Sequence, residues 1–329
     1  MGPRGPHPRH PWGVTMAGVL VFGATSLVGS HFAANPPEGV VIAAAGRRSP
    51  ERLGIPPARF DSVDLHDAKA VEAAVADSPE PVVVNFAART DVDGIERERP
   101  AVSGADPTLS NAYRVNALAP EAMARGARSN GKFLITISTD FIFDGQSGPY
   151  SEGAPPDPLG PLVSWYGWTK GEGERRVHAT LPQAAIIRIS YPYRPPFGGK
   201  SDFAGWVREK GRAGALPPLY TDQQITPTWI PDVTNTVGAL VAQRRPGTFH
   251  VASPTLTTPH GFATSLLEAD TGQRPELATG SLAKRLLEPG VTPRPVRGGL
   301  TTGAAQALGC SLTSWEDGVK ALAGVGTVG

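Results

Sequence analysis

The segment GVLVFGATSLVGSHFA, residues 18–33, decides the fold of this chain. Its residues 19–22 are a short apolar run, which is typical of a buried strand. Residues 23–29 begin and end with glycine and turn the chain, and Leu27, Val28 and Phe32 then recur at the spacing of one helix face. The segment therefore predicts a strand, a tight turn and a helix.

Apolar strands and amphipathic helices alternate along the first part of the chain. The expected strands lie in GVVIAAAGR (39–47), EPVVVNFAA (80–88), GKFLITIS (131–138) and AAIIRIS (184–190). Between them, HDAKAVEAAVAD (66–77) and NALAPEAMARGARS (116–129) have a helical pattern. This alternation indicates a parallel sheet that is buried on both faces. We therefore predict an α/β fold with a doubly wound parallel sheet, that is, a Rossmann fold.

The sequence changes after Tyr191, where loop-rich segments with many prolines and aromatic residues follow. We expect a main domain of residues 17–190 plus about 228–252, and a smaller α/β lobe of residues 191–227 plus 253–329. Residues 1–16 are rich in Pro, Gly, Arg and His, so we expect a disordered extension, and Met16 can be the true start.

The composition argues against several classes of protein. The formal net charge is +1, from 31 basic and 30 acidic residues, so we expect neither nucleic acid nor an anionic membrane as a partner. No apolar run approaches the length of a membrane-spanning helix. Cys310 is the single cysteine and no Cys/His ligand spacing is present, so we expect no metal and a location in the reducing cytoplasm.

The turn GATSLVG, residues 23–29, has the position of a dinucleotide-binding loop. Gly23 and Gly29 fill the outer positions of a GxxGxxG pattern, and Ser26 stands at the middle one. Glycines let the backbone approach a pyrophosphate, and the N-terminus of the following helix offers unpaired N–H groups. The turn therefore indicates a nicotinamide dinucleotide.

The second expected strand ends in AAAGRRS, residues 43–49, and has no acidic residue there. An acidic residue would favour a free ribose 2′-hydroxyl, whereas Arg47 and Arg48 can pair with a 2′-phosphate. NADPH is therefore the expected cofactor, with NADH as an alternative; two solvated arginines in a loop would be the competing explanation. Asp64 and Leu65 close a short strand-like segment and can contact the adenine.

The segments ISTDFIFDG (137–145) and SWYGWTKGEGE (164–174) carry the candidate catalytic residues. Tyr166 and Lys170 are spaced to lie on one helix face, and an ammonium beside a phenol would lower its pKa from about 10. Thr139 can hydrogen-bond a substrate oxygen, and Asp140 can order the site or assist proton transfer. These groups suit the reduction of a ketone; a surface pair on a helix is the alternative for Tyr166 and Lys170.

These segments, taken with others, resemble an extended short-chain dehydrogenase/reductase, and within that class the dTDP-4-dehydrorhamnose reductase family. The resemblance implies NADPH-dependent reduction of a nucleotide-linked 4-keto-6-deoxysugar, with the dinucleotide in the main domain, the substrate in the smaller lobe, and a homodimer as a family-level expectation. The matching segments, in order, are NFAARTDVDGIE (85–96), YRVNALAP (113–120), ISTDFIFDGQSGPYSE (137–152), YGWTKGEGE (166–174), IIRISYPY (186–193), TDQQITPT (221–228) and PRPVRGGL (293–300).

The resemblance also implies roles for single residues. Thr139, Tyr166 and Lys170 match the catalytic triad of the family, and Asn116 matches an asparagine that supports the active-site strands. The expected cofactor contacts are Gly23, Thr25, Ser26, Leu27, Val28, Arg47, Arg48, Asp64, Leu65, Ala87, Ala88, Thr90, Tyr166 and Lys170. The expected substrate contacts are Val92, Asp93, Thr139, Trp165, Asp222 and Gln223. Four arginines can pair with a substrate pyrophosphate or can be solvated, namely Arg194, Arg208, Arg212 and Arg297.

Two segments, 94–112 and 158–165, are longer than the family pattern. We expect the first to extend over the site as a loop and the second to reshape the mouth of the substrate site. The identity of the sugar therefore stays open.

Two other functions also stay open. One is an NAD-dependent nucleotide-sugar epimerase or dehydratase, against which Arg47 and Arg48 argue. The other is a non-catalytic regulatory subunit resembling the methionine adenosyltransferase β-subunit, against which the intact Thr139, Tyr166 and Lys170 argue.

Overall fold

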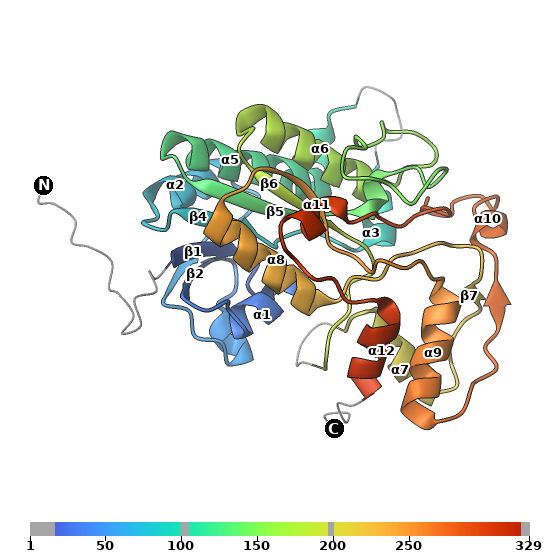
Figure 1. The fold of residues 1–329 in the computed structure, drawn as a ribbon. Helices are drawn as coiled ribbons and strands as arrows, with labels where there is room; N and C mark the ends of the chain where they lie inside the picture. Colours follow the sequence, from blue (N-terminus) through green and yellow to red (C-terminus); the bar gives the residue numbers. More distant parts are fainter. Residues whose placement is uncertain (1–16, 100–104, 197–200, 324–329) are drawn as a thin grey trace, which may run out of the picture.

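The computed structural model describes residues 17–99, 105–196 and 201–323 (Figure 1). The extension expected at residues 1–16 lies outside the described residues. A seven-stranded sheet has the strand order β3-β2-β1-β4-β5-β6-β8, and every neighbouring pair in it is parallel. The prediction of a doubly wound parallel sheet is confirmed. The strands of this sheet are β1 (Ala17–Phe22), β2 (Val40–Gly46), β3 (Arg59–Ser62), β4 (Val82–Asn85), β5 (Phe133–Thr139), β6 (Ala185–Ile189) and β8 (Gly247–His250).

Helices cover both faces of the sheet (Figure 1). One face packs against α2 (Ala68–Asp77), α5 (Ala119–Ser129) and α6 (Trp165–Thr180). The other packs against α1 (Leu27–Ala34), α8 (Ile230–Gln243) and α11 (Gly303–Ala307). Two short helices, α3 (Val92–Glu96) and α4 (Asn111–Tyr113), lie between β4 and α5 along the chain.

The alternation of side chains along β1 explains why both faces are covered. Val19 and Val21 belong to the hydrophobic cluster on the α1 and α8 side, whereas Leu20 and Phe22 belong to the cluster on the α2 and α5 side. All four are fully buried. A continuous apolar run is therefore required in this strand, because neither face meets water.

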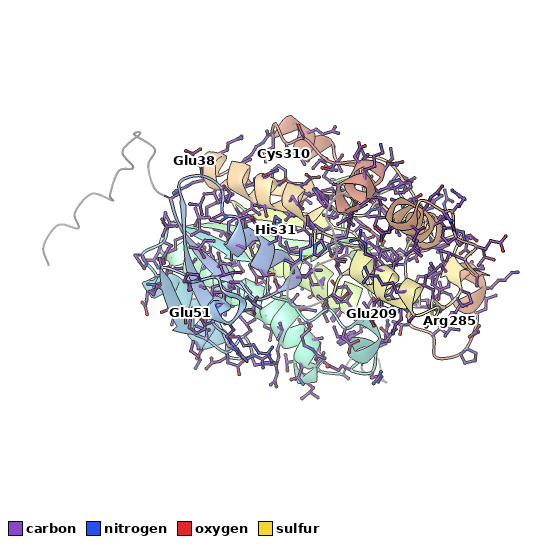
Figure 2. All side chains as sticks on the ribbon, turned by 90° about the horizontal axis from the view of Figure 1, so that it is seen from below. His31, Glu38, Glu51, Glu209, Arg285 and Cys310 are labelled. Carbon is purple, nitrogen blue, oxygen red and sulfur yellow. The ribbon has the colours of Figure 1, made fainter. Side chains whose placement is uncertain are left out.

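A polar contact joins α1 and α8, two helices that cover the same face of the sheet. His31 on α1 has its Nδ1 2.9 Å from Oγ1 of Thr234 on α8 (Figure 2). Burial, with a smaller effect of the Arg194 charge, lowers the pKa of His31 to about 4. The imidazole is therefore neutral at pH 7 and acts as a hydrogen-bonding group between α1 and α8.

A smaller lobe gathers at one end of the sheet (Figure 1). Its own hydrophobic cluster includes Tyr193, Val207, Leu219, Phe262 and Leu322. The cluster is formed by α7 (Phe203–Arg212), α9 (Pro259–Thr271) and α12 (Trp315–Ala323), together with Leu219 of β7 (Leu219–Tyr220). The strand β7 pairs in parallel with β9 (Thr279–Gly280) in a two-stranded sheet, and α10 (Leu282–Arg285) follows β9. In the described part of the chain, no helix has the length and apolar character needed to cross a bilayer.

Candidate active site

The turn after β1 brings its backbone close to β4. Gly23 has a φ of +76°, and a Cβ built on it would lie 2.5 Å from the backbone nitrogen of Ala87. A Cβ on Gly29 would lie 2.2 Å from the carbonyl oxygen of Gly23. Ser26 is the N-cap of α1, and its Oγ accepts a hydrogen bond from the Gly29 N–H at 3.1 Å. Serine at the middle position thus starts the helix, and the two outer glycines keep the turn tight.

The turn opens into a cleft with a volume of about 260 Å³. Small residues at the ends of β1, β2 and β4 line it, and the exposed Arg47 and Arg48 stand at its rim. The lining residues are Gly23, Ala24, Thr25, Ser26, Ala45, Gly46, Arg47, Arg48, Leu65, His66, Ala87, Ala88, Arg89 and Val115. Backbone that can be approached closely, a helix N-terminus and two cations fit the adenosine phosphate end of a dinucleotide.

Asp64 does not line this cleft, although Leu65 beside it does. The Oδ1 atom of Asp64 accepts hydrogen bonds from the backbone N–H of His66 at 3.1 Å and lies 2.9 Å from its Nδ1. These hydrogen bonds hold the pKa of Asp64 below its usual value. The sequence interpretation missed His66, which lines the cleft; no motif marks this histidine.

A second cavity, with a volume of about 500 Å³, adjoins the first and shares Ser26 and Ala88 with it. It contains the candidate catalytic residues together with Leu27, Val28 and Thr90. The lining residues are Ser26, Leu27, Val28, Phe86, Ala88, Thr90, Val92, Ile137, Ser138, Thr139, Asp140, Phe141, Tyr166, Lys170, Ile189, Tyr191, Pro192, Ser201, Asp202 and Phe203. Residues that are distant in sequence thus meet at the carboxyl ends of the strands, where ligands bind in this fold.

Local contacts at the start of α6 fix the position of Tyr166. Ser164 is the N-cap, and its Oγ accepts from the Gly167 N–H at 3.1 Å. Glu96 accepts from the backbone N–H of Trp165 at 2.6 Å. Trp165 itself is 1% exposed, and its Nε1 donates to Ser110 Oγ at 2.9 Å. This structure therefore does not support the expected contact of Trp165 with substrate, because its indole is buried in a cluster with Ile95 and Ala112 and does not line the catalytic cavity.

Burial dominates the electrostatics of Tyr166 and Lys170. Desolvation raises the pKa of the Tyr166 phenol to about 12, and its hydrogen bond with Thr139 acts in the opposite direction. Burial lowers the pKa of Lys170 to about 8 against the attraction of Glu174. Lys170 Nζ donates to the carbonyl oxygen of Ile137 at 2.6 Å. The expectation that Lys170 lowers the pKa of Tyr166 does not hold in this structure, because loss of water around the phenol is the larger effect.

Asn116 ties the catalytic helix to the strand ends. Its Oδ1 accepts from the Arg89 N–H at 2.9 Å, and its Nδ2 donates to the Arg89 carbonyl at 3.1 Å. The same Nδ2 donates to Thr169 Oγ1 on α6 at 3.2 Å. Asn116 lies in a short π-helical stretch, residues 114–118, which interrupts the helical region before α5. This geometry agrees with the supporting role that the sequence assigned to Asn116.

Tyr191 is a site residue that sequence reasoning missed. Its φ is +43°, a left-handed conformation that an aromatic residue rarely adopts. It lines both the catalytic cavity and a further cavity in the smaller lobe, and its hydroxyl donates to Gln223 Oε1 at 3.2 Å. The side chain therefore stands where the two cavities meet. The glycines that signal a left-handed turn are absent here, so only the structure could show it.

The other expected substrate contacts have different surroundings. Val92 lines the catalytic cavity, and Gln223 lines the lobe cavity. Asp93 is paired with Arg294 of the smaller lobe through contacts of 2.8 and 2.9 Å. Asp222 accepts from the hydroxyl of Ser281 and the first N–H groups of α10, at 2.6 to 3.1 Å. The expectation for Asp222 is therefore corrected, because its carboxylate caps a helix.

The lobe cavity has a volume of about 580 Å³ and combines aromatic and basic side chains. Trp206 and Tyr220 offer rings, and Lys284, Arg285 and Arg294 offer positive charge. Arg285 lies at the edge of the lobe (Figure 2). The remaining lining residues are Tyr191, Phe203, Pro217, Pro218, Leu219, Gln223, Pro259, Gly280, Ser281 and Glu288.

None of the four candidate pyrophosphate arginines is among the residues that line the lobe cavity. Arg208 is buried and forms two hydrogen bonds with Asp270, at 2.7 and 2.6 Å. Arg194 is 4% exposed and donates to Ser30 Oγ on α1 at 3.0 Å. Arg212 is exposed on α7, and Arg297 pairs with Gln224 through the backbone. Sequence alone could not separate these arginines from the basic residues that do face the cavity.

The two long segments pack against each other beside α6. Arg99 donates to the carbonyl oxygens of Gly160 and Val163. Glu98 accepts from Ser110 Oγ at 2.8 Å and from the Ala112 N–H at 2.9 Å. The described residues of 158–163 do not line the three cavities above. Residues 100–104, part of the segment expected to cover the site, lie outside the described residues.

The fold and the site together define a class of protein. The chain has a doubly wound sheet and a glycine turn after its first strand, and an adjoining cavity contains Thr139, Tyr166 and Lys170. This combination is typical of an extended short-chain dehydrogenase/reductase. Comparison with known proteins narrows this class. Residues 16–325 match the family described as RmlD substrate binding domain, so the chain belongs to that family.

Named relatives cover most of the chain. It is 33% identical over 301 residues to a dTDP-4-dehydrorhamnose reductase of Streptomyces griseus, which covers 88% of this chain and 85% of the relative. It is 35% identical to a probable low-salt glycan biosynthesis reductase of Haloferax volcanii, over 79% of this chain and 82% of the relative. A dTDP-4-dehydrorhamnose reductase from Bacillus anthracis, solved in complex with NADP, shares the fold with a TM-score of 0.76 at 22% identity, covering 94% of this chain and 99% of that one.

Proposed function

We propose that this protein reduces a nucleotide-linked 4-keto-6-deoxysugar with NADPH, with NADH as an alternative donor. One observation carries the proposal: Thr139, Tyr166 and Lys170 share a cavity that adjoins the cleft above the glycine turn. The names of the relatives and the NADP bound by the fold neighbour support the same chemistry.

The two adjoining cavities fit a dinucleotide that spans them, because they share Ser26 and Ala88 at the glycine turn, where the N-terminus of α1 can bind phosphate. A bound nicotinamide supplies a hydride. Thr139 and Tyr166 bind the carbonyl oxygen of the substrate, and Tyr166 donates the proton that the reduced oxygen takes up. Since burial lowers the pKa of Lys170 to about 8, its ammonium is retained at pH 7 and is available as the expected contact of the bound cofactor.

The nucleotide half of the substrate is assigned to the lobe cavity. Rings such as Trp206 and Tyr220 can pack against a base, and the cations beside them can pair with a diphosphate. Tyr191 lies between this cavity and the catalytic one, so the sugar would lie against it.

The direct test is turnover. Purified protein is mixed with a dTDP-4-keto-6-deoxysugar and NADPH, and cofactor oxidation and sugar product are followed together. An epimerase or dehydratase would carry bound NAD and turn over without added NADPH. A regulatory subunit would co-purify with a synthetase and reduce no keto-sugar. Either result would replace the reductase proposal.

Cofactor preference gives a first prediction. The double variant Arg47→Ala, Arg48→Ala is expected to lower the ratio of kcat/KM for NADPH over NADH by about tenfold or more, because two charged partners of a 2′-phosphate are lost. Steady-state kinetics with both cofactors measures the ratio. Arg52→Ala is the matched control, since Arg52 is exposed nearby and outside the cleft. An unchanged ratio would show that Arg47 and Arg48 do not read the phosphate.

Substrate affinity gives a second prediction. The double variant Lys284→Ala, Arg285→Ala is expected to raise KM for the nucleotide sugar by about tenfold and to leave KM for NADPH unchanged, because both cations line the lobe cavity and neither lines the two cavities assigned to the dinucleotide. Arg274→Ala is the control, since Arg274 is 71% exposed and pairs with Glu268. Equal KM values for the sugar in the double variant and the control would remove the assignment of the diphosphate to this cavity.

The cellular location and the oligomeric state of the protein form a separate proposal. We propose that it works in the cytoplasm, where the single Cys310 stays reduced, and that it forms a homodimer. Light scattering of the purified full chain measures the mass, and a monomer would remove the homodimer without touching the chemistry.

A further inference from the structure

Asp140 is a buried carboxyl group inside the catalytic cavity. It follows β5 directly, is 3% exposed, and lines the cavity with Thr139 and Tyr166. Ser190 Oγ donates to its Oδ2 at 2.7 Å, and its Oδ1 lies 3.3 Å from Thr139 Oγ1. Hydroxyl and backbone groups are thus the partners that favour its ionised form. Asp140 is thus a buried carboxyl group that neutral donors hold beside the Thr139 hydroxyl. Its protonation state therefore affects which hydrogen bonds that hydroxyl can form.

The hydroxyl of Thr139 can donate one hydrogen bond and accept two. The Phe141 N–H donates to Thr139 Oγ1 at 3.3 Å, and the phenol of Tyr166 is also hydrogen-bonded to Thr139. When Asp140 is ionised, its Oδ1 can only accept, so it takes the single proton of Thr139. Thr139 then has no proton left for a substrate oxygen.

Protonation of Asp140 reverses this arrangement. Its Oδ1–H donates to Thr139 Oγ1, while its Oδ2 still accepts from Ser190. Together with the Phe141 N–H, this fills both acceptor sites of Thr139. The protons of Thr139 and Tyr166 then both turn to the open cavity, where the carbonyl oxygen of the substrate would lie.

We propose that Asp140 is a positioning residue that sets the direction of the Thr139 hydroxyl and so decides when the site holds two donors for the substrate oxygen. The inference rests on the proposed reductase function. It gives Asp140 a defined task that acts through Thr139, with Ser190 as the anchor that holds the other carboxyl oxygen in place.

The surrounding charges allow both states near neutral pH. The titratable groups that line the same cavity are Tyr166 and Lys170 on α6, Tyr191 after β6, and Asp202 before α7, and Arg294 of the smaller lobe acts on Tyr191. Burial raises the pKa of Asp140 to about 6, although Ser190 and Thr139 oppose the shift. Because the pKa is raised, the protonated form grows as pH falls through about 6, and the state with two donors is depleted above it.

The prediction concerns the pH profile of kcat in the full chain at saturating NADPH and keto-sugar nucleotide. Wild-type kcat is expected to fall by up to about tenfold per pH unit above about pH 6. In Asp140→Asn an amide N–H can replace the protonated Oδ1, so the variant is expected to keep turnover and lose this dependence. At about pH 8 its kcat should exceed that of the wild type by about tenfold or more.

Asp144→Asn is the matched control for this experiment. Asp144 lies outside the three cavities, and its Oδ1 accepts from the Gln146 N–H and from the Tyr150 hydroxyl, both at 2.9 Å. This variant should keep the wild-type pH profile. Two results would overturn the role of Asp140 and leave the reductase function in place. One is a wild-type kcat that does not change with pH, and the other is an Asp140→Asn variant with the same pH dependence of kcat as the wild type.

A second measurement does not need turnover. Isotope-edited NMR of the aspartate carboxyl groups should show a resonance that titrates near pH 6 and is missing in Asp140→Asn. In Ser190→Ala the same resonance should titrate at higher pH, because a donor to the charged form is lost. A wild type that is inactive but shows this titration would remove the reductase proposal alone. The lack of any such resonance would overturn the proposal for Asp140.

Discussion

Tyr166→Phe is expected to lower kcat by about 10²-fold or more, because the variant keeps the ring and loses the proton donor. The ring of Tyr166 packs edge-on against Phe141 with centroids 5.7 Å apart, and phenylalanine can keep that contact. NADPH binding should therefore stay nearly unchanged. Single-turnover oxidation of NADPH measures the chemical step, and quenching of protein fluorescence measures binding.

The control for this variant is Tyr150→Phe. Tyr150 is also a buried phenol, stacked on Phe143 at 4.0 Å and hydrogen-bonded to Asp144, but it lies outside the catalytic cavity. Its loss should change turnover little. If Tyr166→Phe turned over as fast as the wild type, the proton would have to come from another group, and the role of Tyr166 would be withdrawn.

Glu174→Gln is expected to lower the free energy of unfolding by about 3–5 kcal/mol. Glu174 on α6 and Arg188 on β6 form an ion pair of 2.7 Å with side chains only 4% and 3% exposed. Arg188 also donates to the carbonyl oxygen of Ala154 and contacts His250. Glutamine has nearly the same shape, but it leaves the guanidinium of Arg188 buried without a counter-charge. Urea denaturation followed by circular dichroism measures the change.

Glu172→Gln is the matched control, two residues earlier on the same helix. Glu172 pairs with Arg175, whose side chain is 62% exposed, and lies 3.7 Å from Arg176, which keeps Glu121 as a partner, so its loss should change the free energy of unfolding by only about 0–1 kcal/mol. Equal destabilisation by the two variants would show that the buried pair has no special weight in the stability of the protein.

The layers of the fold could be predicted from the sequence because local patterns dictate them. The run at residues 19–22 is apolar at every position, so the strand must be covered on both faces, and the structure confirms this with separate clusters on either side. The turn at Gly23 could be predicted as well, because a glycine follows the apolar run directly. The structure shows the physical reason, since only a residue without a side chain fits there against Ala87. The structure then placed Thr139, Tyr166 and Lys170 around one cavity.

Other parts of the candidate site depend on contacts between distant segments, which no local pattern encodes. Tyr191 faces both cavities because of an unusual backbone angle. The carboxylate of Asp222 accepts a hydrogen bond from the start of α10, about sixty residues later in the chain. Trp165 was expected to contact the substrate, but its indole N–H donates to Ser110 Oγ in the interior of the protein. In each case the competing partner, rather than the residue type, determines what the side chain does.

The short helix α3 holds two parts of the molecule at once. Asp93 near its start forms an ion pair with Arg294 of the smaller lobe. Glu96 at its end accepts a hydrogen bond from the backbone N–H of Trp165, the residue before Tyr166. The smaller lobe and the start of the catalytic helix are therefore both anchored on the same five residues, Val92–Glu96.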